Sequence, residues 1–377
     1  MKILTTIFAI VLVQLAFTQQ VQAQEESSKL SFSGSADVYF RSNLTAKNNP
    51  AVSAPVPNTA FANRTGFGLG MFNLVGTYET DKVGVVGDLV FGPRGVDAVF
   101  GSGAPKNIVN QLYVYWNASE TVTLTLGNFN TFLGYEVISP ASNFNYSTSY
   151  MFSWGPFSHT GLKADFALSE DASLMLGVFN PTDLTEFNPV NTYSYGAQLG
   201  YKGVYLNLLY GDQDGTLDED AALDGETSAG ALFQVDLTAG FDVTDDFYVG
   251  INATYNSTAQ GEEVKGTTIE DVDGDGNSFY GVAGYFQYST SETFAIGLRG
   301  EYFGEGNGGY GIIGAYDPDF NASVFATTLS ANVSVGDLTF IPELRFDVAS
   351  EEGAFENGDL EATNSLGSFL LAAVYSF

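Results

Sequence analysis

The residue with the clearest catalytic potential is His159, the only histidine in the sequence. A serine hydrolase needs a base beside its hydroxyl, and Ser158 directly precedes His159. Adjacent residues of an extended strand point to opposite faces, so these two side chains are poorly placed as a pair. The sequence also has no cysteine nucleophile. We therefore expect no enzyme, and an outer-membrane hydrolase with His159 as its base is the remote alternative.

A second chemical candidate lies at residues 271–277, which match the first half of a calcium-binding loop. Asp271, Asp273 and Asp275 occupy alternate positions, as the oxygen ligands of such loops do, and a glycine follows for the turn. The glutamate expected at the twelfth position is absent, because residue 282 is valine. Calcium bound at acidic extracellular loops and a simple solvated loop both explain the pattern. No other cofactor is expected.

Two more loops are strongly acidic. Residues 212–228 hold seven acidic residues and residues 349–364 hold five, with no lysine or arginine in either range. Their simplest role is solubility, although at an anionic membrane surface they could share divalent cations with lipid headgroups. Over the whole chain, 44 acidic residues against 13 basic ones give a net charge of −31, which excludes nucleic acid as a partner.

Other charged residues alternate with large apolar residues in the manner of strands. Within 162–168, 294–302 and 338–347, one face carries the charges and the other face is apolar. In a water-filled membrane barrel, this alternation places the charged face in the lumen and the apolar face against lipid. The mixed signs predict weak selectivity. The pore-lining candidates on these strands are Lys163, Asp165, Arg299, Glu301, Glu343, Arg345 and Asp347.

These segments belong to a pattern of alternation that continues from Ser31 to the end of the chain. It predicts sixteen strands, with fourteen or eighteen as alternatives, joined alternately by short turns and long loops. That order is typical of a transmembrane antiparallel β-barrel with short periplasmic turns and long extracellular loops. Pro342 lacks an N–H within one of these strands, which predicts either a bulge there or a strand boundary at a different position. The predicted strand centres are 36, 73, 87, 112, 125, 165, 175, 197, 207, 236, 251, 284, 298, 329, 343 and 372.

The third long loop, residues 130–159, differs from a solvated loop. It carries eight phenylalanine, tyrosine and tryptophan residues but a single carboxylate, Glu136. So much aromatic surface needs to be covered, and the inside of the barrel is the simplest cover. We therefore expect this loop to fold into the lumen and to line or plug it, with Tyr135, Glu136 and Trp154 facing solute. A packed cap on the barrel rim is the alternative.

The N-terminus indicates export. Met1 and Lys2 precede an apolar run over residues 3–17, and Ala23 follows as a cleavage site, so residues 1–23 are predicted to be a signal peptide. Residues 24–377 would then form one barrel domain. The mature chain has no apolar run of the ~20 residues that a membrane helix needs. A chain with 45% hydrophobic residues is also too apolar for disorder despite its charge.

Three short segments resemble the β-barrel porin family, which comprises porin-like outer-membrane proteins of Gram-negative bacteria. They are residues 127–136, 143–147 and 156–161. The C-terminal Tyr375-Ser-Phe377 is also similar to the aromatic signal that directs outer-membrane barrels to their assembly machinery. The resemblance implies an integral barrel of the outer membrane with a porin-like channel. It does not name the solute.

The sequence thus predicts an outer-membrane channel for passive diffusion of small hydrophilic solutes, leaning toward cations because of its net charge. Its expected partners are outer-membrane lipid, the solutes and, through Phe377, the assembly machinery. A homo-oligomer is left open. The first alternative is a non-conducting barrel with a plugged lumen and a structural or surface-interaction role.

Overall fold

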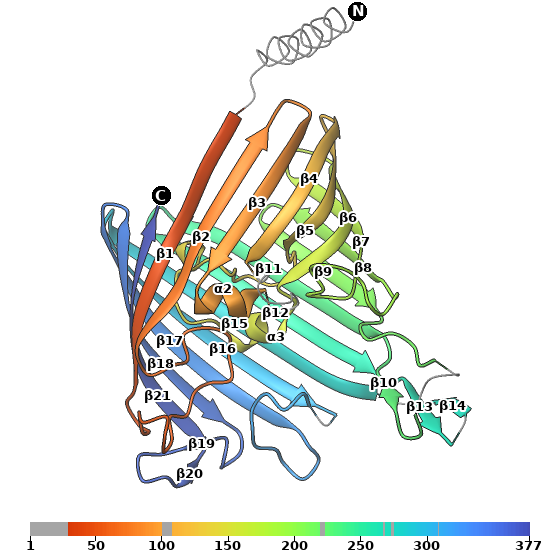
Figure 1. Ribbon diagram of the computed structural model, residues 1–377. Coiled ribbons are helices and arrows are strands. Elements are labelled where there is room, and N and C mark those ends of the chain that lie inside the picture. The colour runs from red at the N-terminus through yellow and green to blue at the C-terminus, as the bar shows by residue number, and fades with distance from the viewer. Residues whose placement is uncertain (1–28, 100–107, 219–222, 267, 273–274, 308) are drawn as a thin grey trace, which may run out of the picture.

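The computed structural model describes residues 29–377, apart from 100–107, 219–222, 267, 273–274 and 308. The predicted signal peptide lies outside these residues. The described chain forms a closed antiparallel barrel of sixteen strands, in which β1 pairs with β21 to complete the ring (Figure 1). The predicted fold class is confirmed.

Each predicted strand centre falls within one barrel strand. Closure is the physical reason for this architecture, because a barrel pairs the backbone groups of every strand and leaves no open edge in lipid. The barrel strands are β1 (Lys29–Asn43), β2 (Gly66–Glu79), β3 (Val83–Phe91), β4 (Val109–Ser119), β5 (Val122–Asn130), β6 (Ser158–Ala167), β7 (Ala172–Phe179), β8 (Ser194–Tyr201), β9 (Val204–Gly211), β11 (Leu232–Thr244), β12 (Phe247–Ala259), β15 (Asp275–Ser291), β16 (Phe294–Gly306), β17 (Ala322–Val335), β18 (Leu338–Ala349) and β21 (Ser365–Ser376).

The connections sort by length as predicted, with the short turns at the end of the barrel where β1 begins and β21 ends (Figure 1). The long loops gather at the opposite end. We name them L1 (44–65), L2 (92–108), L3 (131–157), L4 (180–193), L5 (212–231), L6 (260–274), L7 (307–321) and L8 (350–364).

Short elements, which the sequence did not reveal, lie within these loops. L2 contains helix α2 (Pro93–Ala98), and L3 contains the turn η1 (Pro140–Ser142) and helix α3 (Tyr150–Trp154). L5 and L6 supply a small sheet of β10 (Thr227–Ser228), β13 (Glu262–Lys265) and β14 (Thr268–Asp271), and L8 contains β19 (Phe355–Glu356) and β20 (Ala362–Thr363). Within the described part of the chain, no helix has the length and apolar character to cross a membrane.

The two faces of the wall differ as the alternation predicts. Leu298, Leu329 and Leu344 are paired in register across β16, β17 and β18, and all three are exposed on the outward face. Arg299 and Glu301 alternate with them and are fully buried on the inward face. The bulge predicted at Pro342 is absent, because the β17–β18 register is the same at Ser330–Glu343 and at Val333–Phe340. The proline, which has no N–H to donate, instead lies where the pairing is interrupted between these two pairs.

The outward face makes a first prediction. Replacing Leu298 with arginine should lower the free energy of unfolding by about 2–4 kcal/mol, because a charge would enter the apolar band of a membrane barrel. Thr123→Arg is the control, since Thr123 is half-buried on the inward face of β5. Reversible denaturant titration in lipid vesicles measures the free energy of unfolding of both variants. An equal loss of stability in the two variants would contradict the assignment of the faces.

Candidate functional site

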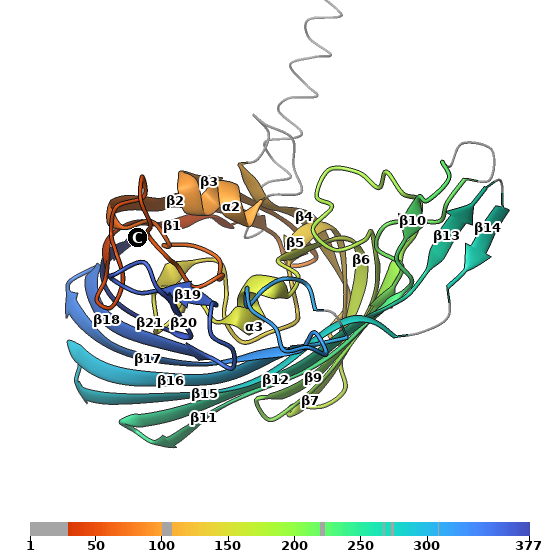
Figure 2. The same ribbon diagram turned by 90° about the horizontal axis from the view of Figure 1, so that it is seen from below.

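L3 lies inside the barrel. Figure 2 looks along the barrel and shows α3 within the ring of strands. The loop crosses from β5 toward β17 and β18 and then returns to β6, and many of its side chains are buried. The prediction that the third long loop folds into the lumen is therefore confirmed.

Carboxylates of the barrel wall hold the backbone of L3. Irregular backbone leaves N–H groups without partners, and a carboxylate makes a strong, charge-assisted acceptor for them. Three wall residues, on β11, β16 and β18, act in this way. Asp236 accepts from Gly134 N at 2.9 Å, Glu301 from Tyr150 N at 2.9 Å and Met151 N at 2.8 Å, and Glu343 from Tyr146 N at 3.0 Å.

Two wall arginines complete the attachment by donating to carbonyl groups of L3. Arg299 donates to the carbonyl of Ser147 at 2.6 Å, and Arg345 donates to the carbonyl of Thr148 at 2.7 Å. Arg345 also forms an ion pair with Asp347 at 2.9 Å. Both guanidinium groups are almost fully removed from water, so their charges need these partners.

Glu136 is the partner of Arg299. One carboxylate oxygen pairs with the Arg299 guanidinium, and the other accepts from the N–H and hydroxyl of Ser149. Only 5% of Glu136 is exposed. The structure thus shows this carboxylate anchoring L3 to the wall, and the expected contact with solute stays a prediction.

The two aromatic pore candidates lie in different surroundings. Tyr135 stacks on Tyr285 with ring centres 4.1 Å apart, and its hydroxyl donates to the Tyr248 hydroxyl at 3.0 Å. Trp154 donates its indole N–H to the carbonyl of Asn58 in L1 at 2.8 Å, and 37% of the residue remains exposed. Of the two, Trp154 offers more surface to water.

Lys163 and Asp165 stand apart from the L3 attachment. They form an ion pair at 3.0 Å on the inward face of β6, with side chains 25% and 41% exposed. The structure thus gathers Glu136, Arg299, Glu301, Glu343, Arg345 and Asp347 around L3, and leaves the β6 pair in contact with water.

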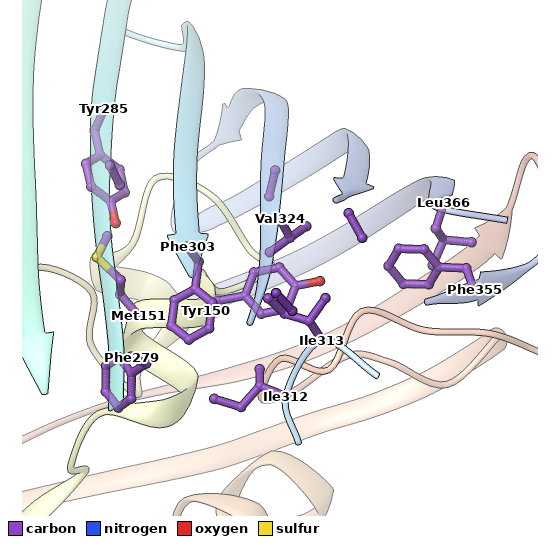
Figure 3. Close-up of a cluster of buried hydrophobic side chains, with 14 residues drawn as sticks. Tyr150, Met151, Phe279, Tyr285, Phe303, Ile312, Ile313, Val324, Phe355 and Leu366 are labelled. Atoms are coloured by element: carbon purple, nitrogen blue, oxygen red, sulfur yellow. The ribbon is translucent and has the colours of Figure 1, made fainter. Parts of the chain in front are cut away.

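A hydrophobic cluster fills the lumen beside β15–β18. Figure 3 shows Tyr150 from L3 packed among wall residues and residues of L7 and L8. Its ring stacks on Phe303 at 5.5 Å, and Ile312, Ile313 and Phe355 belong to the same cluster. Three long loops therefore share one core within this half of the barrel.

Glu305 positions L7 and was not among the predicted site residues. Its carboxylate accepts from the backbone N–H groups of Tyr310, Ile312 and Ile313, at 2.6, 3.0 and 2.9 Å, and from the Tyr316 hydroxyl at 2.7 Å. The inward alternation of Arg299 and Glu301 continues to Glu305, so extending the strand would have found it.

Arg94 of α2 was also missed. It is buried, donates to the carbonyl of Ile138 in L3 at 2.9 Å, and lies over the ring of Phe61 in L1 at 4.3 Å. No periodicity points to it, because it lies in a loop. It links L1, L2 and L3.

His159 is enclosed by aromatic rings. The centre of its ring lies 5.0 Å from the ring centres of Phe132 and Phe179. Its Nε2 lies 3.0 Å from the hydroxyl of Thr131. The side chain is fully buried. This packing places the His159 side chain between L3 and the wall, away from solvent.

The predicted calcium ligands are only partly described. Asp271 is exposed at the end of β14, Asp275 begins β15, and Asp273 lies outside the described residues. Among the residues that the structure describes, no three histidine, aspartate or glutamate side chains gather as a metal site would require. Calcium at these loops stays a prediction.

Asp183 of L4 secures the end of L3. One of its oxygens accepts from the N–H groups of Phe157 and Ser158, at 2.8 and 2.9 Å. Burial raises the pKa of Asp183 to about 6, although the two N–H donors oppose this rise.

The buried Glu136–Arg299 pair makes a second prediction. Arg299→Gln should destabilise the barrel by about 3–5 kcal/mol, because it leaves the Glu136 carboxylate buried without its counter-charge. The double variant Glu136→Gln/Arg299→Gln should regain most of that loss. Denaturant unfolding in detergent measures both. A double variant no more stable than Arg299→Gln would contradict the view that the stability is lost because Glu136 is left without its counter-charge.

Asp183 makes a third prediction. Its pKa is higher in the folded protein than the ordinary 3.8, so the folded state holds the proton more tightly and stability falls as pH rises from 3.8 to about 6. Asp183→Asn should flatten this part of the stability profile. The free energy of unfolding of both proteins is measured in buffers from about pH 3.5 to about pH 7, at steps of roughly half a pH unit. A profile of unchanged slope would contradict the raised pKa.

Comparison with known proteins agrees with this architecture. The outer membrane channel DcaP of Acinetobacter baumannii superposes with a TM-score of 0.58 at 13% identity, covering 93% of this chain and 99% of that one. OmpT of Vibrio cholerae, in a trimer form, gives 0.55 at 10% identity, covering 93% and 100%. These likenesses concern the fold. No curated protein matches the sequence.

The family comparison reaches further, because it covers the whole barrel. Residues 29–377 match the model of the family described as "Putative beta-barrel porin-2, OmpL-like". The match begins at the first residue of β1 and ends at the last residue of the chain. The chain therefore belongs to this family of porin-like outer-membrane β-barrels.

Proposed function

We propose that the protein is a passive channel for small hydrophilic solutes, in which L3 narrows the lumen. The observation that carries this proposal is an asymmetry of the inward face. Along β15–β18, inward charged residues such as Arg299 and Glu301 are sealed beneath L3. Along β4–β8, the inward residues Gln111, Lys163, Asp165 and Gln198 keep partial contact with water, although other polar residues of these strands, such as Asn128, are buried.

The solute path then runs beside L3 along the β4–β8 wall. A sixteen-stranded barrel is wide enough to hold both a folded loop and water. Lys163 and Asp165 would meet the solute there, in line with the sequence-based expectation. Their opposite charges favour weak discrimination, and the acidic long loops would enrich cations at the mouth.

A non-conducting barrel is the second candidate. The cluster that joins L3, L7 and L8 within the lumen favours it, because such a core resembles a plug. The role would then be structural or at the cell surface. Membership of a porin-like family supports the channel, and supports the expectation that the protein is not an enzyme.

Export and insertion are part of the proposal. Cleavage after Ala23 would release the mature chain in a Gram-negative bacterium, and Phe377 would present it to the assembly machinery. Phe377 exchanges two backbone hydrogen bonds with Gly34 of β1, so the last residue takes part in closing the barrel.

The barrel would also form a homo-oligomer, as the trimer form of OmpT does, and its acidic loops would bind calcium.

Single-channel recording in a planar bilayer tests the channel, under a salt gradient. Wild-type protein should give stable open steps with a cation-leaning reversal potential. Asp165→Asn should shift that potential toward anions and Lys163→Gln toward cations, because each removes one charge from the water-exposed wall. Asp245→Asn, in a short turn, is the matched control. A folded but silent barrel would favour the plugged alternative, and steps insensitive to both β6 variants would place the path elsewhere.

A further inference from the structure

A cavity of about 510 Å³ lies at the rim of the barrel, where L5, L6 and L7 meet. Its volume falls within the range of about 300–1,000 Å³ that is usual for small-molecule sites. Strands β10 and β13 of the small sheet, which stands outside the ring of strands (Figure 2), line one side, and the ends of β12 and β15 line the other. None of its lining residues belongs to L3, so the cavity is separate from the L3 attachment.

Small residues bend the chain around this space without filling it. A side chain at Gly261 of L6 would collide with the carbonyl oxygen of Ser228 in L5, so only glycine permits the two loops to cross there. Ala229 and Ala259 line the cavity beside this crossing and add little bulk. The crossing therefore forms a narrow frame with room for a ligand beside it.

Tyr310 of L7 supplies an aromatic wall and is held at both ends. Its backbone N–H donates to Glu305 at 2.6 Å. Its hydroxyl lies 2.9 Å from the Thr258 hydroxyl and donates to Asn256 at 3.1 Å. The half-buried ring also lies against Phe279, with ring centres 5.9 Å apart. The ring is thus fixed beside the cavity before any ligand arrives, which lowers the cost of ordering the site on binding.

Carboxylates bring negative charge to the same cavity. Glu262 and Glu263 both line it, and both are half-buried. Glu262 accepts from the N–H of Leu217 at 3.0 Å, and Glu263 lies 3.4 Å from the ammonium group of Lys265. L5 holds seven acidic residues and no basic one, and L6 holds five acidic residues and one lysine. Such a field attracts cations and repels anions.

The walls then select among cations and neutral molecules. A metal ion needs several oxygen ligands at short range, and no three histidine, aspartate or glutamate side chains gather in that way in the part of the chain that the structure describes. Ala229, Ala259 and Val272 instead suit a hydrocarbon body, and the face of a tyrosine ring attracts an ammonium group. A neutral sugar would gain nothing from the negative field.

We propose that this cavity binds an organic ammonium ion, which is a protonated amine carried on a short apolar or aromatic body. The ammonium group would meet the carboxylates of Glu262 and Glu263, and the body would lie against Tyr310 and Val272. This inference goes beyond the proposed channel, because a ligand at the rim requires nothing of the lumen.

The test compares three probes that share one aromatic body. Phenethylamine carries the positive charge, phenethyl alcohol is its neutral counterpart, and phenylacetate is its anionic counterpart. Binding of each to the mature protein is measured by titration calorimetry in detergent at low salt, with the heat from empty micelles subtracted. Glucose is titrated in the same way, because a sugar is the alternative occupant.

Two double variants locate the binding. Glu262→Gln/Glu263→Gln removes the two carboxylates that line the cavity. Glu270→Gln/Asp271→Asn is the matched control, since these residues pair with Glu263 and Glu262 across β13 and β14 but do not line the cavity. Lys265 contacts Glu263 and Glu270 alike, so each double variant removes one of its partners. Circular dichroism and heat-dependent gel mobility confirm that each variant has folded as a barrel.

Phenethylamine should bind the wild type and the control variant equally, and the Glu262→Gln/Glu263→Gln variant about tenfold more weakly, as expected when two exposed charge interactions are lost. The alcohol and phenylacetate should bind the wild type more weakly than the amine. An alcohol that binds as tightly as the amine, or an equal loss in both double variants, would overturn the proposal. So would a wild type that binds no phenethylamine, or that binds glucose in its place.

Discussion

The interior of this barrel depends on how the backbone N–H groups of L3 are satisfied. An irregular segment enclosed by a wall has no ladder of its own, and each buried N–H without an acceptor would cost free energy. Asp236, Glu301 and Glu343 supply those acceptors from three separate strands. Because carboxylates are fixed to rigid strands, they set the path of the loop more firmly than contacts between loops could.

Burying these carboxylates requires compensation, and the chain provides it in two ways. Arg299 and Arg345 bring opposite charge through their ion pairs with Glu136 and Asp347. The N–H groups of L3 donate directly to Asp236, Glu301 and Glu343. Glu305 is compensated in the second way, because N–H groups of L7 donate to its carboxylate. No arginine is bonded to it among the described residues. Beside β15–β18 the loops and the wall form a dry core, whereas Lys163 and Asp165 on β6 still meet water.

The sequence predicted the wall better than the interior. Strict alternation placed Arg299, Glu301 and Glu343 on the inward face, because a strand has only two faces and lipid selects one of them. The alternation could not show that Glu136 pairs with Arg299 instead of facing solute, since that contact joins residues 163 positions apart. Arg94 and α2 were invisible for a related reason, as loop conformation follows from packing against L1 and L3 rather than from local periodicity.

Tyr146 has a consequence for the order of assembly. Its hydroxyl donates to Asp37 on the first strand, and its N–H donates to Glu343 on the next-to-last barrel strand, 109 and 197 residues away. β21 lies between those two strands and is the last to be made. These two contacts can therefore coexist only after the two ends of the chain have met. The seat that the structure shows for L3 therefore has the closed ring as its condition, since β1 and β18 both hold Tyr146.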